Sequence, residues 1–384
     1  MEYGLYLHLP YCRSLCPYCA FAKAPLHRAE PERLLRALAA EWKLARGADS
    51  GWSRPRTVFF GGGTPTALDV TILRRLFAWL RESFDLSQVR EWTVEANPEG
   101  LTREKLAVLR EAGVDRLSLG IQSLEPGVLR FLGRIHSPER ALEAIEDARH
   151  AGFRNISVDL MAAVPGETAE GFRRAVEALL ALRVQHVSVY SLQIEPGTPL
   201  AGKAARGAFA PADDDAAAER YEDLARLLTP AGYAHYEVSN WALPGYASRH
   251  NQGYWVLRPY LGLGPGAHSF DGRERWRNEE NVTRYYERLE AGSLPREDRA
   301  PISEREHAVE RIMLGLRRAR GLKRRSLEAL AGASVTSWST WAERAGALRL
   351  DPPGRIRPTE RGLLLAQEIA SDLLARADRT PSPA

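Results

Sequence analysis

The chain has 384 residues, enough for two domains or for one large domain with an appendage. Hydrophobic residues make up 44% of the sequence and charged residues 27%, which excludes a disordered, collagen-like or coiled-coil protein. The net charge of +4 is too small to indicate that the whole chain binds nucleic acid, although it leaves an anionic ligand open.

Cysteine usage and the lack of long apolar runs predict a cytoplasmic protein. No run of about 18 or more apolar residues occurs, and the start of the chain lacks the features of a leader peptide. Three cysteines cannot form a disulfide framework, and their odd number is typical of metal or redox chemistry in a reducing compartment. All three, Cys12, Cys16 and Cys19, lie within eight positions, which makes this cluster the most informative feature of the sequence.

A repeated βα pattern fills the first half of the chain. Short β-like runs alternate with amphipathic helical stretches. The expected strands are Gly4–Leu9, Thr57–Phe60, Glu91–Glu95, Arg116–Leu119, Ile156–Met161 and Val187–Leu192. Helix starts lie between them, for example at Ser137-Pro138-Glu139, where a capping serine precedes a proline and an acid. Six such units predict an α/β fold whose parallel sheet forms a partial (β/α)6 barrel of the TIM type, and a doubly wound sheet is the alternative.

Chemically reactive residues follow the carboxyl ends of these strands, where the loops of such barrels form binding sites. The segments in question are the cysteine loop, Gly61–Pro65, Glu95–Pro98, Gly120–Ser123, Asp159 within the fifth strand and Gln193 after the sixth. In the glycine run, backbone without Cβ atoms lets a ligand approach closely, and we expect its N–H groups to be free to bind one.

The pattern changes after residue 196, and we divide the chain accordingly. The expected units are a barrel domain at 1–235, a connecting polar-aromatic segment at 236–300, a small, mostly helical, winged-helix-like domain at 301–375 and a flexible tail at 376–384. A basic run at 317–325 could contact nucleic acid or an anionic membrane. We interpret it as a solvated helix end and expect no nucleic-acid partner.

The cysteine spacing allows two kinds of metal centre. A structural zinc site needs four protein ligands, so His8 or His27 would have to complete it. A [4Fe–4S] cluster held by three thiolates leaves one iron open for a substrate or cofactor. We favour the cluster, because the chain has no fourth cysteine.

With this loop after the first strand, the chain resembles the radical S-adenosylmethionine (SAM) superfamily. The resemblance implies a [4Fe–4S] cluster whose open iron is chelated by the methionyl amino and carboxylate groups of SAM. One electron then passes to the sulfonium, and a 5′-deoxyadenosyl radical can form. In that family a segment similar to Gly61–Pro65 holds the methionyl amino group.

A narrower resemblance is to oxygen-independent coproporphyrinogen III oxidase and its relatives. Tyr6 and His8 match the first strand of that branch, and Tyr18 falls where an aromatic residue lies against adenine. The resemblance implies that SAM contacts Tyr6, Tyr18, Gly62, Gly63, Thr64, Glu95, Gln122, Arg134, Asp159 and Gln193. Carboxylates suit ribose hydroxyls, and a guanidinium suits a carboxylate.

The sequence departs from the oxidases in two places. Phe21 stands where they have a fourth cysteine, and only 11 residues precede Cys12, where they carry a substrate-binding extension. Instead, His250-Asn251-Gln252-Gly253-Tyr254-Trp255 resembles a signature of the haem chaperone relatives. The resemblance implies a haem site with His250 as axial ligand, Asn251 orienting the loop, and Tyr254 and Trp255 covering the macrocycle. A buried structural histidine is the alternative.

We therefore expect a radical-SAM-type haem chaperone that delivers haem to haem-dependent proteins. An electron donor such as flavodoxin or ferredoxin is expected if the cluster is reduced. The first alternative is an enzyme, a coproporphyrinogen oxidative decarboxylase in which Tyr6 and His8 are catalytic. The second is a zinc-stabilised nucleic-acid-binding module. Transient membrane contact and the oligomeric state stay open.

Overall fold

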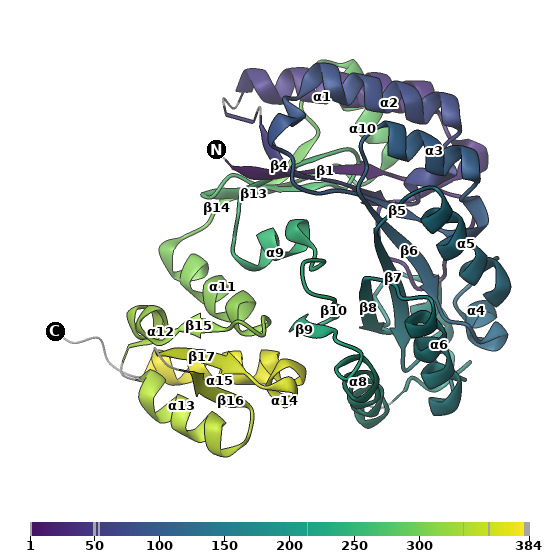
Figure 1. Ribbon diagram of the computed structural model, residues 1–384. Coiled ribbons are helices and arrows are strands. Elements are labelled where there is room, and N and C mark those ends of the chain that lie inside the picture. Colours follow the sequence, from purple (N-terminus) through teal and green to yellow (C-terminus); the bar gives the residue numbers. More distant parts are fainter. Residues whose placement is uncertain are drawn as a thin grey trace.

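The computed structural model describes residues 2–48, 51–52, 54–212, 214–332, 334–351 and 354–379. Its largest sheet has twelve strands in the order β14-β13-β12-β11-β1-β4-β5-β6-β7-β8-β10-β9 (Figure 1). The middle of this order holds six parallel strands, and shorter strands extend both edges. No helix within the described ranges is both long and apolar enough to cross a membrane.

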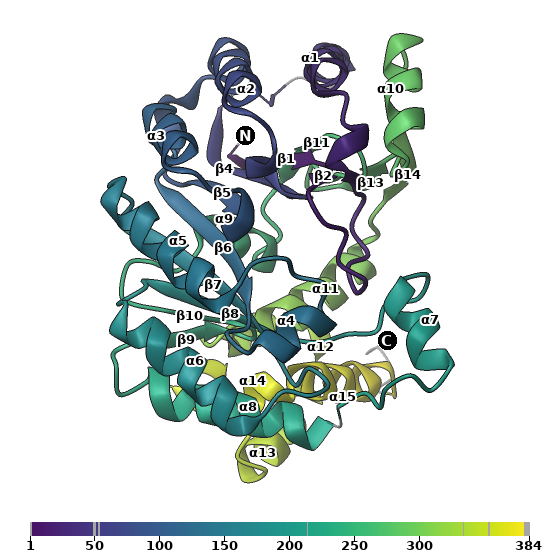
Figure 2. The ribbon, with the colours of Figure 1, turned by 90° about the vertical axis from the view of Figure 1, so that its right-hand side faces the viewer.

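The six parallel strands are those expected from the sequence. They are β1 (Tyr3–Leu9), β4 (Pro55–Gly62), β5 (Trp92–Ala96), β6 (Arg116–Gln122), β7 (Asn155–Ala162) and β8 (His186–Ser191). The crossovers contain α1 (Pro31–Ala48), α2 (Val70–Ser83), α3 (Arg103–Glu111), α4 (Pro126–Phe131), α5 (Pro138–His150) and α6 (Ala169–Ala181). Ser137 caps α5 through the Arg140 N–H, as expected. The partial barrel is confirmed (Figure 2).

Strand periodicity explains both sides of this sheet. One set of alternating side chains is apolar and packs beneath the surrounding helices, including Leu5, Leu7, Val58, Phe60, Val94, Leu117 and Val158. The other set faces the barrel interior and is largely polar, including Tyr6, His8, Thr93, Glu95, Ser118 and Asp159. The interior is therefore suited to polar ligands near its open end.

Residues 236–300, expected to form a connecting segment, complete the sheet. β9 (Ala234–Glu237) and β10 (Asn240–Ala242) extend one edge beyond β8. β11 (Tyr260–Leu263) runs parallel to β1, followed by antiparallel β12 (His268–Phe270), β13 (Glu274–Asn278) and β14 (Arg296–Pro301). The helices of this segment are α9 (Arg249–Trp255) and α10 (Val282–Glu290), and α7 (Pro199–Ala205) and α8 (Asp214–Leu228) precede it.

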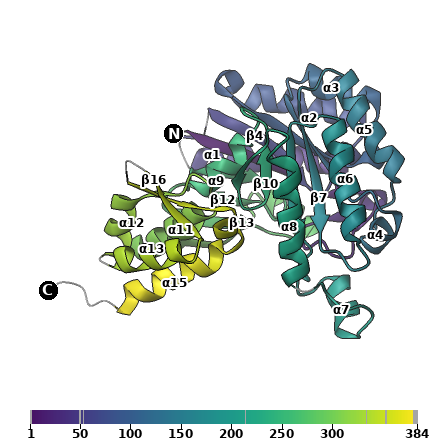
Figure 3. The ribbon, with the colours of Figure 1, turned by 60° about the horizontal axis from the view of Figure 1, so that its bottom comes forward.

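A separate apolar core holds the C-terminal part together. Figure 3 shows the helices of this part to one side of the barrel. Its centre includes Leu316, Leu327, Trp338, Ile356 and Leu373. The helices are α11 (Glu304–Leu316), α12 (Arg324–Ala331), α13 (Ser334–Arg344), α14 (Glu360–Leu364) and α15 (Ala366–Arg379). A small sheet joins β15 (Leu322–Lys323), β17 (Arg355–Pro358) and β16 (Leu348–Asp351). Helix α15 continues into the predicted tail as far as Arg379, and 380–384 lie outside the described residues.

Candidate cofactor site

A cavity of about 380 Å³ lies at the carboxyl ends of the barrel strands. Eleven of the predicted site residues line it, namely Cys12, Cys16, Tyr18, Cys19, Gly62, Gly63, Thr64, Glu95, Gln122, Arg134 and Asp159. Ala96, Asn97 and Gly120, which lie in the expected strand-end segments, also line the cavity. The other lining residues are Phe21, Ser14, Lys23, Ser118, Met161 and Tyr190, of which the last five were not predicted. The structure thus brings together residues that are spread over six strands and their loops.

The cysteine loop closes over one side of this cavity. β2 (Tyr11–Cys12) pairs with β3 (Ala24–Pro25), which ties the two ends of the loop together. All three thiols are free and partly exposed. Within the described ranges, no three His, Cys, Asp or Glu side chains converge tightly enough to share a single metal ion. In a [4Fe–4S] cluster each thiolate binds its own iron.

Hydrogen bonds connect two of the cysteines through the cavity wall. Thr64 donates to the Cys12 sulfur at 3.7 Å, and the Asn97 amide donates to the Thr64 hydroxyl at 2.8 Å. Arg134 donates to the Asn97 side-chain oxygen at 2.7 Å and to the Cys16 sulfur at 3.7 Å. Asn97 therefore links the groups that face both thiols. Its place directly after a strand, two positions beyond Glu95, was the available sequence signal.

The glycine run is required by its protein neighbours. A Cβ on Gly63 would lie 2.6 Å from the Pro10 carbonyl carbon, and Gly62 has a φ of 103° with its added Cβ against the His8 ring. The expectation of free N–H groups is wrong for Gly63 and Thr64, which donate to the Leu9 and Tyr11 carbonyls at 2.9 Å each. These bonds hold the loop against the end of β1.

Two buried carboxyl groups lie deep in the cavity. Burial, and secondarily the nearby Asp159, raises the pKa of Glu95 to about 8. Burial also raises the pKa of Asp159, which accepts hydrogen bonds from Ser118 at 3.2 and 3.3 Å. The Gly62 N–H also donates to Glu95, and Ser188 also donates to Asp159. Each carboxyl group lines the cavity and can accept a further hydrogen bond from a hydroxyl group of a ligand.

An apolar patch lies beside the cysteine loop. Tyr18 packs against a small cluster formed by Val128, Leu132, Met161 and Val164. Met161 and Tyr18 both line the cavity, so the patch offers a flat, desolvated wall next to the thiols. A planar aromatic ring such as a purine fits a surface of this kind.

Three predicted residues lie away from the cavity lining. Tyr6 is inside the barrel, where its hydroxyl contacts His8 Nδ1 at 3.1 Å. His8 Nε2 is 2.7 Å from the Ala22 carbonyl oxygen, and burial lowers the pKa of His8 to about 4. Gln193 is exposed beyond the end of β8. The pair Tyr6–His8 thus lies beneath the cavity, and Gln193 lies outside it.

His250 lies at the opposite end of the barrel strands. It is 3% exposed, Nδ1 is 2.8 Å from the Thr57 hydroxyl, and Nε2 is 2.9 Å from the Tyr254 hydroxyl. Burial lowers the pKa of His250 to about 3. Both ring nitrogens therefore contact hydroxyl groups inside the protein, and the role of His250 as an axial ligand remains a prediction. The geometry matches the alternative, a buried structural histidine.

Glu91, which lies outside the motif, fixes the start of α9. The Glu91 carboxylate accepts the Arg249 and His250 N–H groups at 2.7 and 2.9 Å, which satisfies donors at the helix N-terminus. Asn251 and Trp255 are partly buried. α9 packs between the inner side of the sheet and α11 (Figure 1).

Comparison with known proteins places the chain in a family. The model of the radical SAM superfamily matches residues 6–179. Heme chaperone HemW of Mycobacterium tuberculosis is 40% identical over 380 residues, which cover 97% of this chain and 95% of that protein. This chain belongs to the HemW family of radical SAM proteins. HemW of Bacillus subtilis is 36% identical, with 86% of this chain and 87% of that protein covered.

A solved structure shares the fold of this HemW family member. Coproporphyrinogen III oxidase (HemN) from Escherichia coli superposes with a TM-score of 0.81 at 23% identity. The superposition covers 97% of this chain and 90% of that chain. It therefore includes the C-terminal part as well as the partial barrel.

Membership of the radical SAM superfamily implies a [4Fe–4S] cluster and SAM, and the donor set fits both. Three thiols border a cavity whose other walls carry carboxyl, guanidinium and aromatic groups. The zinc alternative lacks its fourth ligand, because both ring nitrogens of His8 are engaged and His27 does not line the cavity. A SAM molecule bound there supplies radical chemistry when one electron reaches its sulfonium.

Proposed function

We propose that this chain is a haem chaperone, which binds haem and delivers it to haem-dependent proteins. The observation that carries this proposal is the similarity to HemW of Mycobacterium tuberculosis over 97% of this chain and 95% of that protein. Such coverage includes the barrel, the α9 motif and the C-terminal domain, so no large part of the relative is missing here.

We propose the following roles for the cavity residues. Cys12, Cys16 and Cys19 hold the [4Fe–4S] cluster. Glu95 and Asp159, which both line the cavity, accept hydrogen bonds from the ribose hydroxyls. Arg134, already held by the Gly120 carbonyl at 2.6 Å, binds the methionyl carboxylate. The remaining predicted contacts are Tyr18, Gly62, Gly63, Thr64 and Gln122, which line the cavity, and Tyr6 and Gln193, which lie outside its lining.

We also propose the partners and the compartment. The thiols are partly exposed, and the exposed Phe21 and the Lys23 ammonium group lie beside them, so a small acidic electron carrier such as flavodoxin or ferredoxin can reach the cluster. A reducing cytoplasm keeps such thiols available for iron. Membrane contact, which the sequence leaves open, is tested by sedimentation with anionic vesicles.

Haem binding by the whole chain tests the function. The cluster-loaded protein is titrated anaerobically with ferric haem (hemin) and followed by the Soret band. We expect saturation near one haem per chain, with a band distinct from that of free haem. A spectrum that stays the sum of free haem and protein would contradict a chaperone role.

A further inference from the structure

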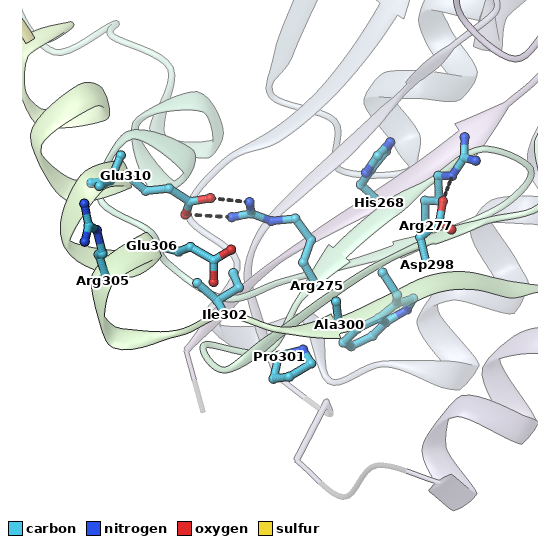
Figure 4. A pocket seen from close by; sticks show the side chains of 12 residues that line it. His268, Arg275, Arg277, Asp298, Ala300, Pro301, Ile302, Arg305, Glu306 and Glu310 are labelled. Atoms are coloured by element: carbon cyan, nitrogen blue, oxygen red, sulfur yellow. Dashed lines mark hydrogen bonds and ion pairs between the residues drawn. The ribbon is translucent and has the colours of Figure 1, made fainter. Parts of the chain in front are cut away.

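A second cavity, of about 530 Å³, lies between the outer strands of the sheet and α11. Its lining residues are His268, Arg275, Trp276, Arg277, Asp298, Ala300, Pro301, Ile302, Arg305, Glu306, Val309 and Glu310. Figure 4 shows His268, Arg275 and Arg277 rising from the strands, with Glu310 facing Arg275 from the helix. A cavity of this size and mixed character is typical of a small-molecule site.

This cavity continues the inner face of the barrel. Tyr6 is in register with Gly262 of β11, and a Cβ on Gly262 would meet the backbone of His268 on β12. His268 in turn pairs with Arg277 of β13. Because directly paired residues point to the same side of a sheet, His268 and Arg277 lie on the face that carries Tyr6.

His268 differs from most of the nine histidines. Both ring nitrogens are engaged in His8, His136, His186 and His250, and His235 is stacked on Trp241. The His268 ring is exposed and makes no hydrogen bond to the residues that the structure describes. His27, His150 and His307 are also unbonded there, but none of them lines this cavity.

The polar side of the cavity is held in place. Arg275 makes two hydrogen bonds to the Glu310 carboxylate, at 2.5 and 3.1 Å. Arg277 donates to Asp298 at 2.7 Å, and Asp298 lies in a β-bulge with a φ of 50°. A bulge of this kind commonly aims a side chain. Arg277 also donates to Glu280 at 2.6 Å and lies 3.9 Å from the Glu297 carboxylate, while Arg275 Nε has no hydrogen-bond partner among the described residues. A guanidinium has five donors, so both arginines keep N–H groups for a further carboxylate, and Arg275 has the fewer carboxylates around it.

Aromatic rings connect this cavity to the α9 motif. The Arg275 guanidinium lies 5.1 Å above the Phe270 ring, and Phe270 contacts Tyr260 at 6.2 Å between centroids. Tyr260 packs edge-on against Tyr254, which contacts His250. The motif thus supports the strands that line the cavity without entering it.

We propose that haem binds in this second cavity with His268 as an axial ligand to its iron. The proposal rests on the haem chaperone function proposed above. Pro301, Ile302 and Val309 provide apolar walls for the macrocycle, and imidazole is an ordinary ligand of haem iron. The free N–H groups of Arg275 and Arg277 bind the propionates.

His268→Ala in the full, cluster-loaded chain tests this assignment, with His150→Ala as a matched control. His150 is exposed at the end of α5 and lines none of the cavities described above. In a hemin titration we expect His268→Ala to bind at least tenfold more weakly, with a shifted Soret band that added imidazole restores. The control should titrate like the parent, and both variants should keep their iron content.

Two outcomes separate the site from the function. If the parent binds haem and His268→Ala gives the same Soret band and affinity, the assignment to this cavity is overturned while the chaperone function stands. If the parent itself binds no haem, the proposed function fails, and the site with it.

Discussion

Asn97→Ala removes the side chain that links Thr64, which faces Cys12, to Arg134, which faces Cys16. It deletes the hydrogen bonds to Thr64 at 2.8 Å and to Arg134 at 2.7 Å. A neutral hydrogen bond contributes about 1 kcal/mol and a charged one about 1.5–3 kcal/mol. Arg134 keeps the Gly120 carbonyl as a partner, so we assign only the charged bond to SAM binding. The dissociation constant of SAM should then rise by roughly ten- to a hundredfold.

The assay is anaerobic calorimetric titration of the cluster-loaded protein with SAM. Asn281→Ala is the matched control, because Asn281 caps α10 through the Thr283 and Arg284 N–H groups and does not line the cavity. Losing that cap costs about 1 kcal/mol of stability and should leave SAM affinity unchanged. If Asn97→Ala binds SAM as tightly as the parent, Asn97 does not position Arg134. If both variants weaken SAM binding alike, the effect reflects general destabilisation.

Three further predictions follow from the cavity. Replacing any one of Cys12, Cys16 and Cys19 by alanine should remove the cluster. Iron and sulfide analysis should then show the loss of about four iron and four sulfide per chain. Full iron content in one of these variants would show that the replaced cysteine is not a cluster ligand. Because the pKa of Glu95 is raised to about 8, the free energy of unfolding of the SAM-free protein should fall as the pH rises from about 4.5 to about 8. In urea titrations at pH 5 and 8, Glu95→Gln should reduce the pH dependence of the free energy of unfolding. If the variant keeps the pH dependence of the parent, the pKa of Glu95 is not raised in the folded protein. We expect no sustained coproporphyrinogen decarboxylation, because Phe21 stands where the resemblance to the oxidases implies a fourth cysteine. Turnover under anaerobic reducing conditions would contradict this and make Tyr6 and His8 catalytic candidates again.

The barrel strands could be predicted because apolar side chains recur at alternate positions in short segments that lie between helix caps. The edge strands could not. In β13 only Trp276 and Asn278 are buried, while Arg275 and Arg277 face the second cavity, so the segment looks polar in sequence. Strands of three to five residues, such as β12 and β13, also carry too little periodicity to stand out.

The cofactor cavity was predictable for a geometric reason, since the carboxyl ends of parallel strands meet at one edge. Two details were not. Hydrogen bonds from Gly63 and Thr64 to the end of β1 depend on which strands are neighbours, which sequence alone leaves open. The His250 imidazole is satisfied by Thr57 from a strand nearly two hundred residues earlier and by Tyr254 within its own motif. Polar aromatic side chains in one motif can therefore hydrogen-bond to one another and to neighbouring strands instead of to a ligand.

Transfer of haem tests the chaperone function most directly. The cluster-loaded chain is saturated with haem, separated from excess, and mixed with an apo haem protein such as apomyoglobin. We predict that the Soret band of the acceptor grows while the band of this chain declines, faster than when the acceptor takes haem from a non-specific carrier such as albumin. Haem that stays on the chain, or transfer no faster than from albumin, would contradict the chaperone function.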